Sequence, residues 1–398
     1  MLDHQHISNT HINASNGYWS VGEEVFFSKI SALIKAHSTK QRVKFHFNDH
    51  IYNTVKWNIE PQESLQQLYL QRALELRDQY DYLIILYSAG SDSTNMIKTF
   101  IDNKIKIDQV ASWGCKNHHW GDLDLPNVEI TKAGSEMIKK IINMGIKFTF
   151  ENLLDTEIFK KEFRTSDWAS RAGPTLSISC VMKQLAVFQK KEYLELTKKG
   201  KKVCFLWGLE KARPCLIRGN YYLNFDDQIL KGQSTASRSS PDYPIPHEHF
   251  YSGPDTTSTK ILAKQAHLIL NYCEKNFTKQ QIEKIIGVTN DPGKVIGPDP
   301  FRELHMLMND LIYPDTWDNK TFTVGKPVLE WMDKPSRPFL HDKTTSEYKI
   351  WQGGVSDVLN NIDLLYKESF ETTGSFYSIS KFQFVRAAYF KNKHSNIF

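Results

Sequence analysis

The chain has 398 residues, of which 40% are hydrophobic and 24% charged, and its formal net charge is +5. This length predicts two or three substructures with a sizeable core, and the composition is that of an ordinary soluble globular protein. No apolar stretch approaches the roughly 20 residues of a membrane span, and the first residues carry no signal-peptide pattern. The small positive excess permits an anionic substrate or a nucleic acid and requires neither.

The cysteines are five in number and scattered, without a CxxC pair: Cys115, Cys180, Cys204, Cys215 and Cys273. Such a set is typical of reduced thiols in a cytoplasmic protein. The missing CxxC argues against a four-cysteine zinc site or a cysteine-ligated cluster. We therefore expect a cytoplasmic protein with no membrane partner.

The first region, residues 1–80, is predicted to be an α+β section that packs on the region after it. Alternation of apolar and polar residues at 43–47 predicts a strand with one exposed face. A stripe of apolar residues between 64 and 80 predicts a helix. Arg72 and Arg77 on this helix are expected to be solvated or paired, without a functional role.

The second region, residues 81–232, alternates predicted strands and helices. We expect strands at 82–87, 109–113, 146–150 and 203–207, and helices at 93–103, 134–144 and 176–199. Apolar strands that alternate with helices are typical of a doubly wound parallel sheet, so an α/β fold is predicted. Ligands of such sheets bind at the carboxyl ends of the strands, near the point where the strand order reverses.

The third region, residues 233–398, begins with a Ser/Pro-rich connector and is predicted to be a mainly helical substrate or accessory region. Apolar spacing predicts a helix at 258–276. A second helix is expected from Thr278, where Gln281 completes a capping box. His247 and His249 have strand-like spacing for two metal ligands, but the sequence offers no evident third ligand.

The most informative stretch is Ser-Ala-Gly-Ser-Asp-Ser at 88–93, directly after the predicted strand 82–87. A buried strand that turns through a small, hydroxyl-rich loop into a helix can bind phosphate, because backbone N–H groups and the helix dipole face the anion. Asp92 falls in the first helical turn, where a carboxylate suits the dipole and can help to hold a magnesium ion. The alternative is a serine-rich turn that binds nothing.

This spacing resembles the SGGxDS signature of the PP-loop ATP pyrophosphatases, the adenine-nucleotide α-hydrolase superfamily. The resemblance implies a HUP-like fold with ATP bound by the loop residues Ser88, Ala89, Gly90, Ser91, Asp92 and Ser93. Ala89 stands where a glycine is usual, and its methyl group disfavours positive φ. The chain departs from a Walker A loop because no Gly-Lys-Ser/Thr follows.

Two later segments, 179–183 and 207–214, extend the resemblance toward the reductase-like branch of the superfamily. In that branch a Cys…Lys segment follows the third strand, and a Gly…Glu-Ser…Arg segment leaves the fourth. Here Gly208 and Glu210 are expected to contribute to nucleotide binding, with Glu210 orienting a base or sharing a metal ion. Lys211 occupies the position of the serine, and the Gly-to-Glu spacing is shorter.

The expected catalytic residues are Asp92, Lys183, Lys211 and Arg213. The three bases would neutralise phosphate charge as the bond between the α- and β-phosphates breaks. For Lys183 a solvated position on a helix is the alternative. Cys180, near a helix start and beside Lys183, is either a thiolate nucleophile or a buried packing residue.

The second predicted strand ends at Ala111, Ser112 and Trp113. In the superfamily, residues at this position usually contact adenine, so this strand end is expected to bind the base. An ordinary core tryptophan is the alternative interpretation of Trp113.

The resemblance implies an enzyme that cleaves ATP to AMP and pyrophosphate, with magnesium, and adenylates a substrate oxygen for replacement by nitrogen or sulfur. Nothing in the first 80 residues resembles a glutaminase domain, so nitrogen would come from free ammonia, an amine substrate or a separate donor protein. The whole chain is similar to PP-loop proteins of bacteriophages that are described as asparagine-synthetase-like or reductase-like. This similarity suggests nucleotide or nucleic-acid modification in a host cytoplasm.

Two other functions stay open at this point. One is a sulfur-handling reductase or sulfurtransferase that uses Cys180, and the other is a non-catalytic nucleotide sensor in which Ala89 weakens hydrolysis. For the enzyme, Asp92→Asn is expected to abolish activity while the melting temperature stays nearly unchanged.

Overall fold

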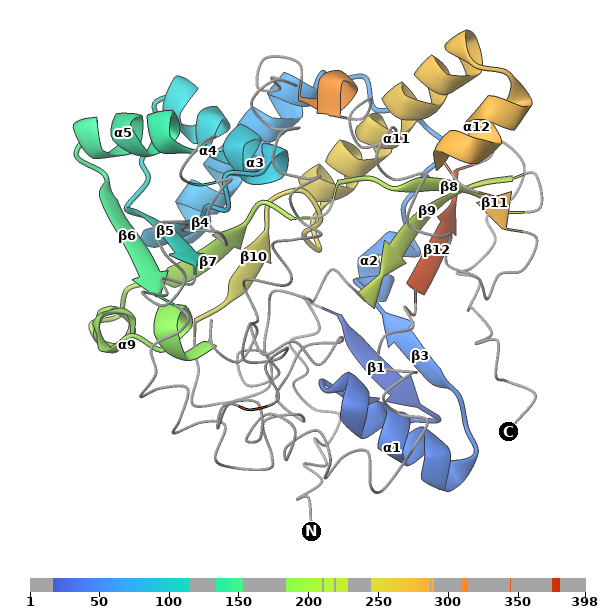
Figure 1. Cartoon of the computed structure of the whole chain (residues 1–398), viewed down its shortest axis with the longest axis horizontal. Helices are drawn as coiled ribbons and strands as arrows, with labels where there is room; N and C mark the ends of the chain where they lie inside the picture. The colour runs from blue at the N-terminus through green and yellow to red at the C-terminus, as the bar shows by residue number, and fades with distance from the viewer. Residues whose placement is uncertain are drawn as a thin grey trace.

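The computed structural model describes residues 17–114, 130, 134–152, 184–209, 211–217, 220–227, 245–286, 288–289, 309–313, 344 and 374–379. Within these ranges a five-stranded parallel sheet has the order β10-β7-β4-β5-β6 (Figure 1). Its strands are β4 Tyr82–Leu86, β5 Gln109–Gly114, β6 Lys147–Asn152, β7 Val203–Trp207 and β10 His247–His249. The predicted α/β fold with a parallel sheet is confirmed, and the fifth strand comes from the region beyond residue 233.

Helices cover both faces of this sheet, as expected for a doubly wound fold (Figure 1). On one face lie α3 Leu65–Gln79, α4 Ser91–Asp102 and α5 Ser135–Asn143, and on the other a π-helical turn, Gln184–Phe188, and α9 Lys191–Lys198. Successive side chains of β4 point to opposite faces of the sheet, and Leu83 and Ile85 are buried with α3 and α4. Phe205 of β7 faces the other layer, and its ring centroid lies 4.9 Å from that of Phe188.

The helix predicted at 176–199 differs from the structure in its described part. Instead of one helix, the chain forms the π-helical turn, bends at Gln189 and Lys190, and then begins α9. The turn packs the buried Phe188 edge-on against His247, with ring centroids 4.7 Å apart. This packing across the sheet interrupts the helix, and no glycine or proline marks the break in the sequence.

The N-terminal section is an antiparallel sheet with the order β2-β1-β3, followed by helices. Its elements are β1 Tyr18–Val21, β2 Glu24–Phe26, α1 Lys29–Thr39, β3 Val43–His46 and α2 Asp49–Tyr52. A buried ion pair joins this section to the end of a further, four-stranded sheet, because Lys29 Nζ lies 2.8 Å from Asp227 Oδ2. Burying two charges is tolerated here because they neutralise one another.

The four-stranded sheet has the order β11-β8-β9-β12 and packs with the C-terminal helices. Its strands are β8 Pro214–Ile217, β9 Asn220–Asp226, β11 Val288–Thr289 and β12 Gly374–Ser378, and the helices are α11 Thr256–Asn276 and α12 Lys279–Ile286. The predicted capping box is confirmed: Thr278 N donates to Gln281 Oε1 at 2.9 Å, and Gln281 N to Thr278 Oγ1 at 3.4 Å. The strands of this sheet were not predicted from the sequence.

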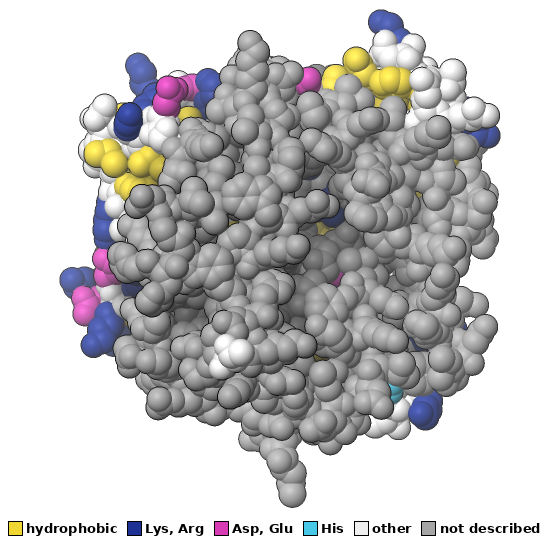
Figure 2. Space-filling model, in the orientation of Figure 1, with side chains coloured by type: hydrophobic (Ala, Val, Ile, Leu, Met, Phe, Trp, Pro, Cys, Tyr) yellow, Lys and Arg dark blue, Asp and Glu magenta, His cyan; other side chains and the backbone are white. Residues whose placement is uncertain are grey.

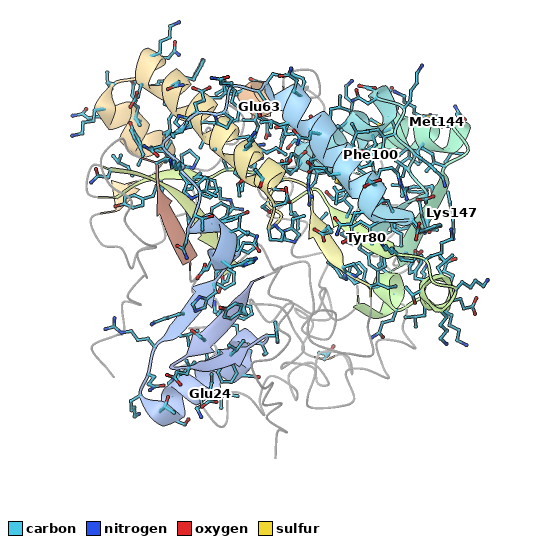
Figure 3. All side chains as sticks on the ribbon, turned by 180° about the vertical axis from the view of Figure 1, so that it is seen from behind. Glu24, Glu63, Tyr80, Phe100, Met144 and Lys147 are labelled. Atoms are coloured by element: carbon cyan, nitrogen blue, oxygen red, sulfur yellow. The ribbon has the colours of Figure 1, made fainter. Side chains whose placement is uncertain are left out.

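Ion pairs hold α3 beside α11. Lys260 Nζ lies 2.5 Å from Glu63 Oε1, just before the start of α3 (Figure 3). Arg72 of α3 is buried, and its guanidinium contacts Glu248 Oε2 at 3.4 Å and Asp255 Oδ2 at 3.1 Å. Arg72 is therefore paired, one of the two expected states, and joins α3 to β10 and the following turn.

The surface over α5 and α9 carries mixed charge. Along the left edge of Figure 2, Lys and Arg side chains alternate with Asp and Glu. Lys147 of β6, for example, pairs with Glu192 of α9 at 2.7 Å. Of the helices that the structure describes, none combines the length and apolar character that crossing a bilayer requires.

The Asp108 carboxylate joins α3, β4 and the segment before β5. It accepts hydrogen bonds from Arg77 Nη1 at 2.6 Å, Lys106 Nζ at 2.7 Å and Leu83 N at 2.9 Å. Burial alone would raise the pKa of Asp108, but these hydrogen bonds outweigh it and lower the pKa below its ordinary value. Its stabilising contribution is therefore complete above the unfolded-state pKa of about 3.9 and is lost as pH falls through the folded-state pKa.

We expect Asp108→Asn to lower the free energy of unfolding by about 1–2 kcal/mol near neutral pH, because a charged acceptor is lost. The difference from the unchanged protein should shrink below about pH 4. Urea unfolding over this pH range measures both quantities. Asp102→Asn is the control, because that carboxylate is exposed and its loss should cost less than about 1 kcal/mol. A difference that is independent of pH would contradict the assignment.

Candidate functional site

The candidate site lies where the strand order of the parallel sheet reverses. From β4 the chain runs outward to β5 and β6, and then returns to β7 on the other side of β4. The carboxyl ends of β4 and β7 are therefore adjacent, and a crevice at such a point is where open α/β sheets bind ligands. The predicted loop at 88–93 follows β4, and Gly208 follows β7.

The loop after β4 contains a left-handed residue at Ala89, whose φ is +62°. The sequence predicted that alanine disfavours this conformation, yet the structure adopts it at an expected cost of about 1–2 kcal/mol. The Ala89 methyl group is buried against Gly134, the residue before α5. A Cβ at Gly134 would lie 2.8 Å from the Ala89 Cβ, so the missing side chain there makes room for the methyl group.

Serine hydroxyls hold the loop against the first turn of α4. Ser93 Oγ donates to Gly90 O at 3.1 Å and accepts from Ser88 N at 3.3 Å. Gly90 is the N-cap of α4, and its carbonyl accepts the first helical bond, from Thr94 N at 2.9 Å. The N–H groups of Ser91 to Ser93 therefore belong to the first turn, whose donors have no acceptor within a helix and can bind an anion.

Gly208 allows α4 to approach the end of β7. A Cβ at Gly208 would lie 2.7 Å from Ser93 Cα and 2.9 Å from Ser93 N, closer than van der Waals contact permits. The close approach to backbone atoms explains a glycine at this position. Gly208 thus sets the distance between the loop at 88–93 and the segment that carries Lys211.

Asp92 and Lys211, both predicted from the sequence, form an ion pair at this place. Lys211 Nζ lies 3.0 Å from Asp92 Oδ1 and donates to Asn309 Oδ1 at 2.8 Å. The lysine is only 6% exposed, whereas the Asp92 side chain is 24% exposed. Tyr313 OH donates to the same carboxylate oxygen at 3.1 Å, and Tyr251 OH to the Asp92 carbonyl at 2.8 Å.

The tyrosines beside Asp92 remain phenols at neutral pH. Burial raises the pKa of Tyr313, and the negative charge of Asp92 raises it further. Burial, followed by the neighbouring Tyr69 and Asp92, raises the pKa of Tyr251. Both hydroxyl groups therefore donate hydrogen bonds and add no negative charge.

Sequence reasoning missed Asn309 and Tyr313. Residues 309–312 are helical, and this segment with the following Tyr313 brings both side chains to Asp92 and Lys211. The stretch beyond Pro298 is aromatic and interrupted by prolines, so it contains no periodic signal that would have singled them out. The Asn309 amide nitrogen is buried, and it has no hydrogen-bond partner among the described residues.

A chain of side-chain hydrogen bonds fixes the backbone next to Lys211. Ala212 N donates to Gln265 Oε1 of α11 at 2.9 Å, and Gln265 Nε2 donates to Tyr69 OH of α3 at 2.9 Å. Tyr69 OH in turn donates to Ile312 O at 2.8 Å. Three separate parts of the chain therefore determine where the ammonium group lies.

The turn after β10 depends on the N-terminal section. Asn48 Nδ2 and Tyr52 OH both donate to Ser252 O, at 3.1 and 3.0 Å. Ser252 follows Tyr251, so these bonds help to hold the tyrosine against Asp92. The N-terminal section therefore contributes to the candidate site from a distance.

The three predicted residues at the end of β5 have two different structural roles. Ser112 Oγ donates to Tyr87 O at 2.7 Å, and Tyr87 N donates to Ala111 O at 2.9 Å, which fixes the start of the loop. Trp113 is half-buried, and its ring centroid lies 5.8 Å from that of Trp207 of β7. The structure thus places two tryptophans near the carboxyl ends of β5 and β7, the strands on either side of β4.

The remaining predicted residues lie outside this cluster or outside the described residues. Arg213 is half-buried before β8, and its carbonyl accepts from Asn224 N at 3.0 Å. Lys183, Glu210 and Cys180 lie outside the described residues. The described cysteines are buried, and burial raises the pKa of Cys215 to about 12 and, with the Glu274 charge, that of Cys273 to about 11.

His247 and His249 both have a ring nitrogen in contact with a neighbouring side chain. Trp207 Nε1 donates to His247 Nδ1 at 2.9 Å, and His249 Nδ1 lies 3.3 Å from Ser252 Oγ. Among the residues that the structure describes, no group of three or more His, Cys, Asp or Glu side chains could hold a metal ion.

The close approach at Gly208 yields a test of the site's architecture. We expect Gly208→Ala to lower the free energy of unfolding by about 1–3 kcal/mol, since its Cβ meets backbone atoms of α4. Gly90→Ala is the matched control, because its φ is −75° and its Cβ would lie 3.5 Å from Ser88 Oγ. The control should cost less than about 1 kcal/mol. Equal losses for the two variants in urea unfolding would contradict this role.

Comparison with known proteins adds no relative to this picture: no protein-family model matches the chain, and no curated protein matches it either. The chain is thus described by its fold, a five-stranded parallel α/β sheet that is consistent with a Rossmann-like fold, with an N-terminal antiparallel section and C-terminal helices.

Proposed function

We propose that this chain is a PP-loop enzyme that binds ATP and cleaves it to AMP and pyrophosphate, adenylating a substrate oxygen. The observation that carries the proposal is the ion pair between Asp92, in the first turn of α4, and Lys211, in the segment after β7, where the strand order reverses. A carboxylate and a buried ammonium group beside the N–H groups of a helix's first turn match what triphosphate binding requires.

The loop and the strand ends divide the work of binding. The first-turn N–H groups and the exposed Ser88 would bind the phosphates. The carboxyl end of β5, with Ala111, Ser112 and Trp113, would bind adenine. A bound magnesium ion would supply positive charge to the phosphates. Its carboxylate ligand would be the partly exposed Asp92, since Mg²⁺ sites on nucleotides commonly use one or two carboxylates besides phosphate oxygens.

Lys211 would exchange partners during the reaction. Without nucleotide its ammonium group is neutralised by Asp92, and with nucleotide the phosphate oxygens offer a second anion. A substrate oxygen attacks the α-phosphorus, the bond to the bridging oxygen of the β-phosphate breaks, and pyrophosphate leaves with the electron pair. Lys211 would stabilise the charge that develops there, and the buried Asn309 amide would be a further donor.

A nitrogen or sulfur donor would then attack the carbon that bears the adenylated oxygen; its bond to that carbon forms, the carbon–oxygen bond breaks, and AMP leaves with the oxygen. The acceptor class that we favour is a small molecule or a nucleotide, because Lys and Arg alternate with Asp and Glu along the described edge over α5 and α9 (Figure 2). The resemblance to asparagine-synthetase-like proteins of bacteriophages supports nucleotide modification as the setting. A separate donor protein is part of the same proposal.

Binding is tested first, with the non-cleavable analogue α,β-methylene-ATP and magnesium. We expect the analogue to raise the melting temperature of the unchanged protein. Asp92→Asn and Lys211→Gln should remove most of this shift. The matched controls are Asp102→Asn and Lys98→Gln, which alter an exposed pair on the same helix and should keep the shift. An equal shift in all five proteins would contradict binding at this site.

Cleavage is tested with ATP labelled at the α-phosphate and a small-molecule extract as the source of acceptor. We expect labelled AMP or an adenylate, and a loss of at least about 100-fold in Asp92→Asn and Lys211→Gln. ADP as the product would contradict the proposal. Tight binding without turnover would favour a nucleotide sensor, and loss of turnover in Cys180→Ser would favour the sulfur-handling alternative.

The Asp92 variant also separates catalysis from folding. The amide oxygen of Asn can still accept from Lys211 and Tyr313, so the melting temperature without nucleotide should fall only slightly. A large fall would mean that the carboxylate is chiefly structural.

A further inference from the structure

A second cluster of reactive side chains lies in the N-terminal section, apart from α4 and the loop after β4 (Figure 1). Ser20 of β1, His46 of β3 and Asp49 of α2 are joined by two hydrogen bonds. Ser20 Oγ lies 2.8 Å from His46 Nε2, and His46 Nδ1 lies 2.8 Å from Asp49 Oδ2. Nucleophile, base and orienting carboxylate within 2.6–3.2 Å is the geometry of an activated serine.

The chemistry of the three groups fixes the direction of both hydrogen bonds. An ionised carboxylate only accepts, so His46 Nδ1 carries a proton and donates to Asp49. In a neutral imidazole the other nitrogen is then an acceptor, so Ser20 Oγ–H donates to His46 Nε2. This is the tautomer in which the imidazole can take the hydroxyl proton.

Neighbouring groups hold the imidazole and the carboxylate in place. The Tyr18 ring stacks on His46 with centroids 4.6 Å apart and an interplanar angle of 12°. Phe47 N donates to the second oxygen of Asp49 at 3.3 Å. Both hydrogen bonds are part-buried: Ser20 is 8% exposed, and the side chains of His46 and Asp49 are 16% and 24% exposed, so the imidazole and the carboxylate are the more accessible part of the cluster.

A positive charge lies on the same face as the serine. Lys44 is directly opposite Ser20 in the antiparallel register of β1 and β3. Opposed residues of an antiparallel pair point to the same face, with Cβ atoms about 4.5–5.5 Å apart. The Lys44 ammonium group can therefore stabilise an oxyanion that forms on an acyl group bonded to Ser20.

We propose that Ser20 is the nucleophile of a second active site, which hydrolyses carboxylic esters. Ser20 Oγ bonds to the ester carbonyl carbon while its proton passes to His46 Nε2. The C–O bond to the alcohol then breaks, and the alcohol leaves with that proton. Water attacks the acyl-serine with His46 as base, which releases the acid and restores the hydroxyl.

The test uses a fluorophosphonate probe, which phosphonylates activated serines, on the full-length protein, with peptide mass mapping of the product. We expect one labelled site, at Ser20, with a rate at least about 100-fold above that of Ser38 in the same molecule. Ser38 is the internal control, because it is exposed on α1 and its hydroxyl donates to the Lys35 carbonyl, without an imidazole. No label at Ser20, or equal rates at the two serines, would overturn the proposal.

Variants then test the relay, by which we mean the two hydrogen bonds that join Ser20, His46 and Asp49. Ser20→Ala should abolish labelling and the hydrolysis of p-nitrophenyl acetate, and His46→Gln should slow both at least about 100-fold. Asp49→Asn should slow both as well, because the imidazole tautomer is no longer fixed. An ester hydrolysis rate that is unchanged in Ser20→Ala would overturn the assignment. The mapping in the unchanged protein decides the matter even where a variant fails to fold, and the outcome is independent of ATP cleavage.

Discussion

The Lys211 ammonium group, which is 6% exposed, lies 3.0 Å from Asp92 Oδ1, and the side chain of Asp92 is itself 24% exposed. The pair requires the first turn of α4 to meet the segment after β7, which Gly208 permits by having no side chain. Asn309 accepts a hydrogen bond from Lys211, and Tyr313 donates one to Asp92. The ends of β4 and β7, the loop at 88–93 and residues 309–313 therefore meet at this one ion pair.

The N-terminal section and α11 support the pair from outside the parallel sheet. Asn48 and Tyr52 bind the carbonyl of the turn that carries Tyr251, and Gln265 binds the backbone beside Lys211. Arg72 connects α3 to β10 and to the same turn. Elements that carry no phosphate-binding group thus determine the geometry of the candidate phosphate site.

Two kinds of chemistry are spatially separated in this chain. The cluster at the end of β4 combines helix donors with a neutralised lysine, which suits phosphate transfer. The relay of Ser20, His46 and Asp49 lies on another sheet, and it provides proton transfer from a hydroxyl. Among the residues that the structure describes, the two clusters share no side chain, so we expect the two proposed activities to be separable by substitution.

The sequence by itself determined the local features of the protein. The strands β4 to β7, the helices α3, α4, α5 and α11, and the capping box at Thr278 follow from periodicities and caps within about 20 residues of chain. It also placed Asp92, Gly208 and Lys211 at strand ends that a parallel sheet brings to one edge. Only the tertiary structure decided their partners, because Lys211 and Asp92 are 119 residues apart and Tyr313 and Asp92 are 221 apart. Contacts at such separations depend on how whole elements pack, and no pattern in a short window of sequence encodes them.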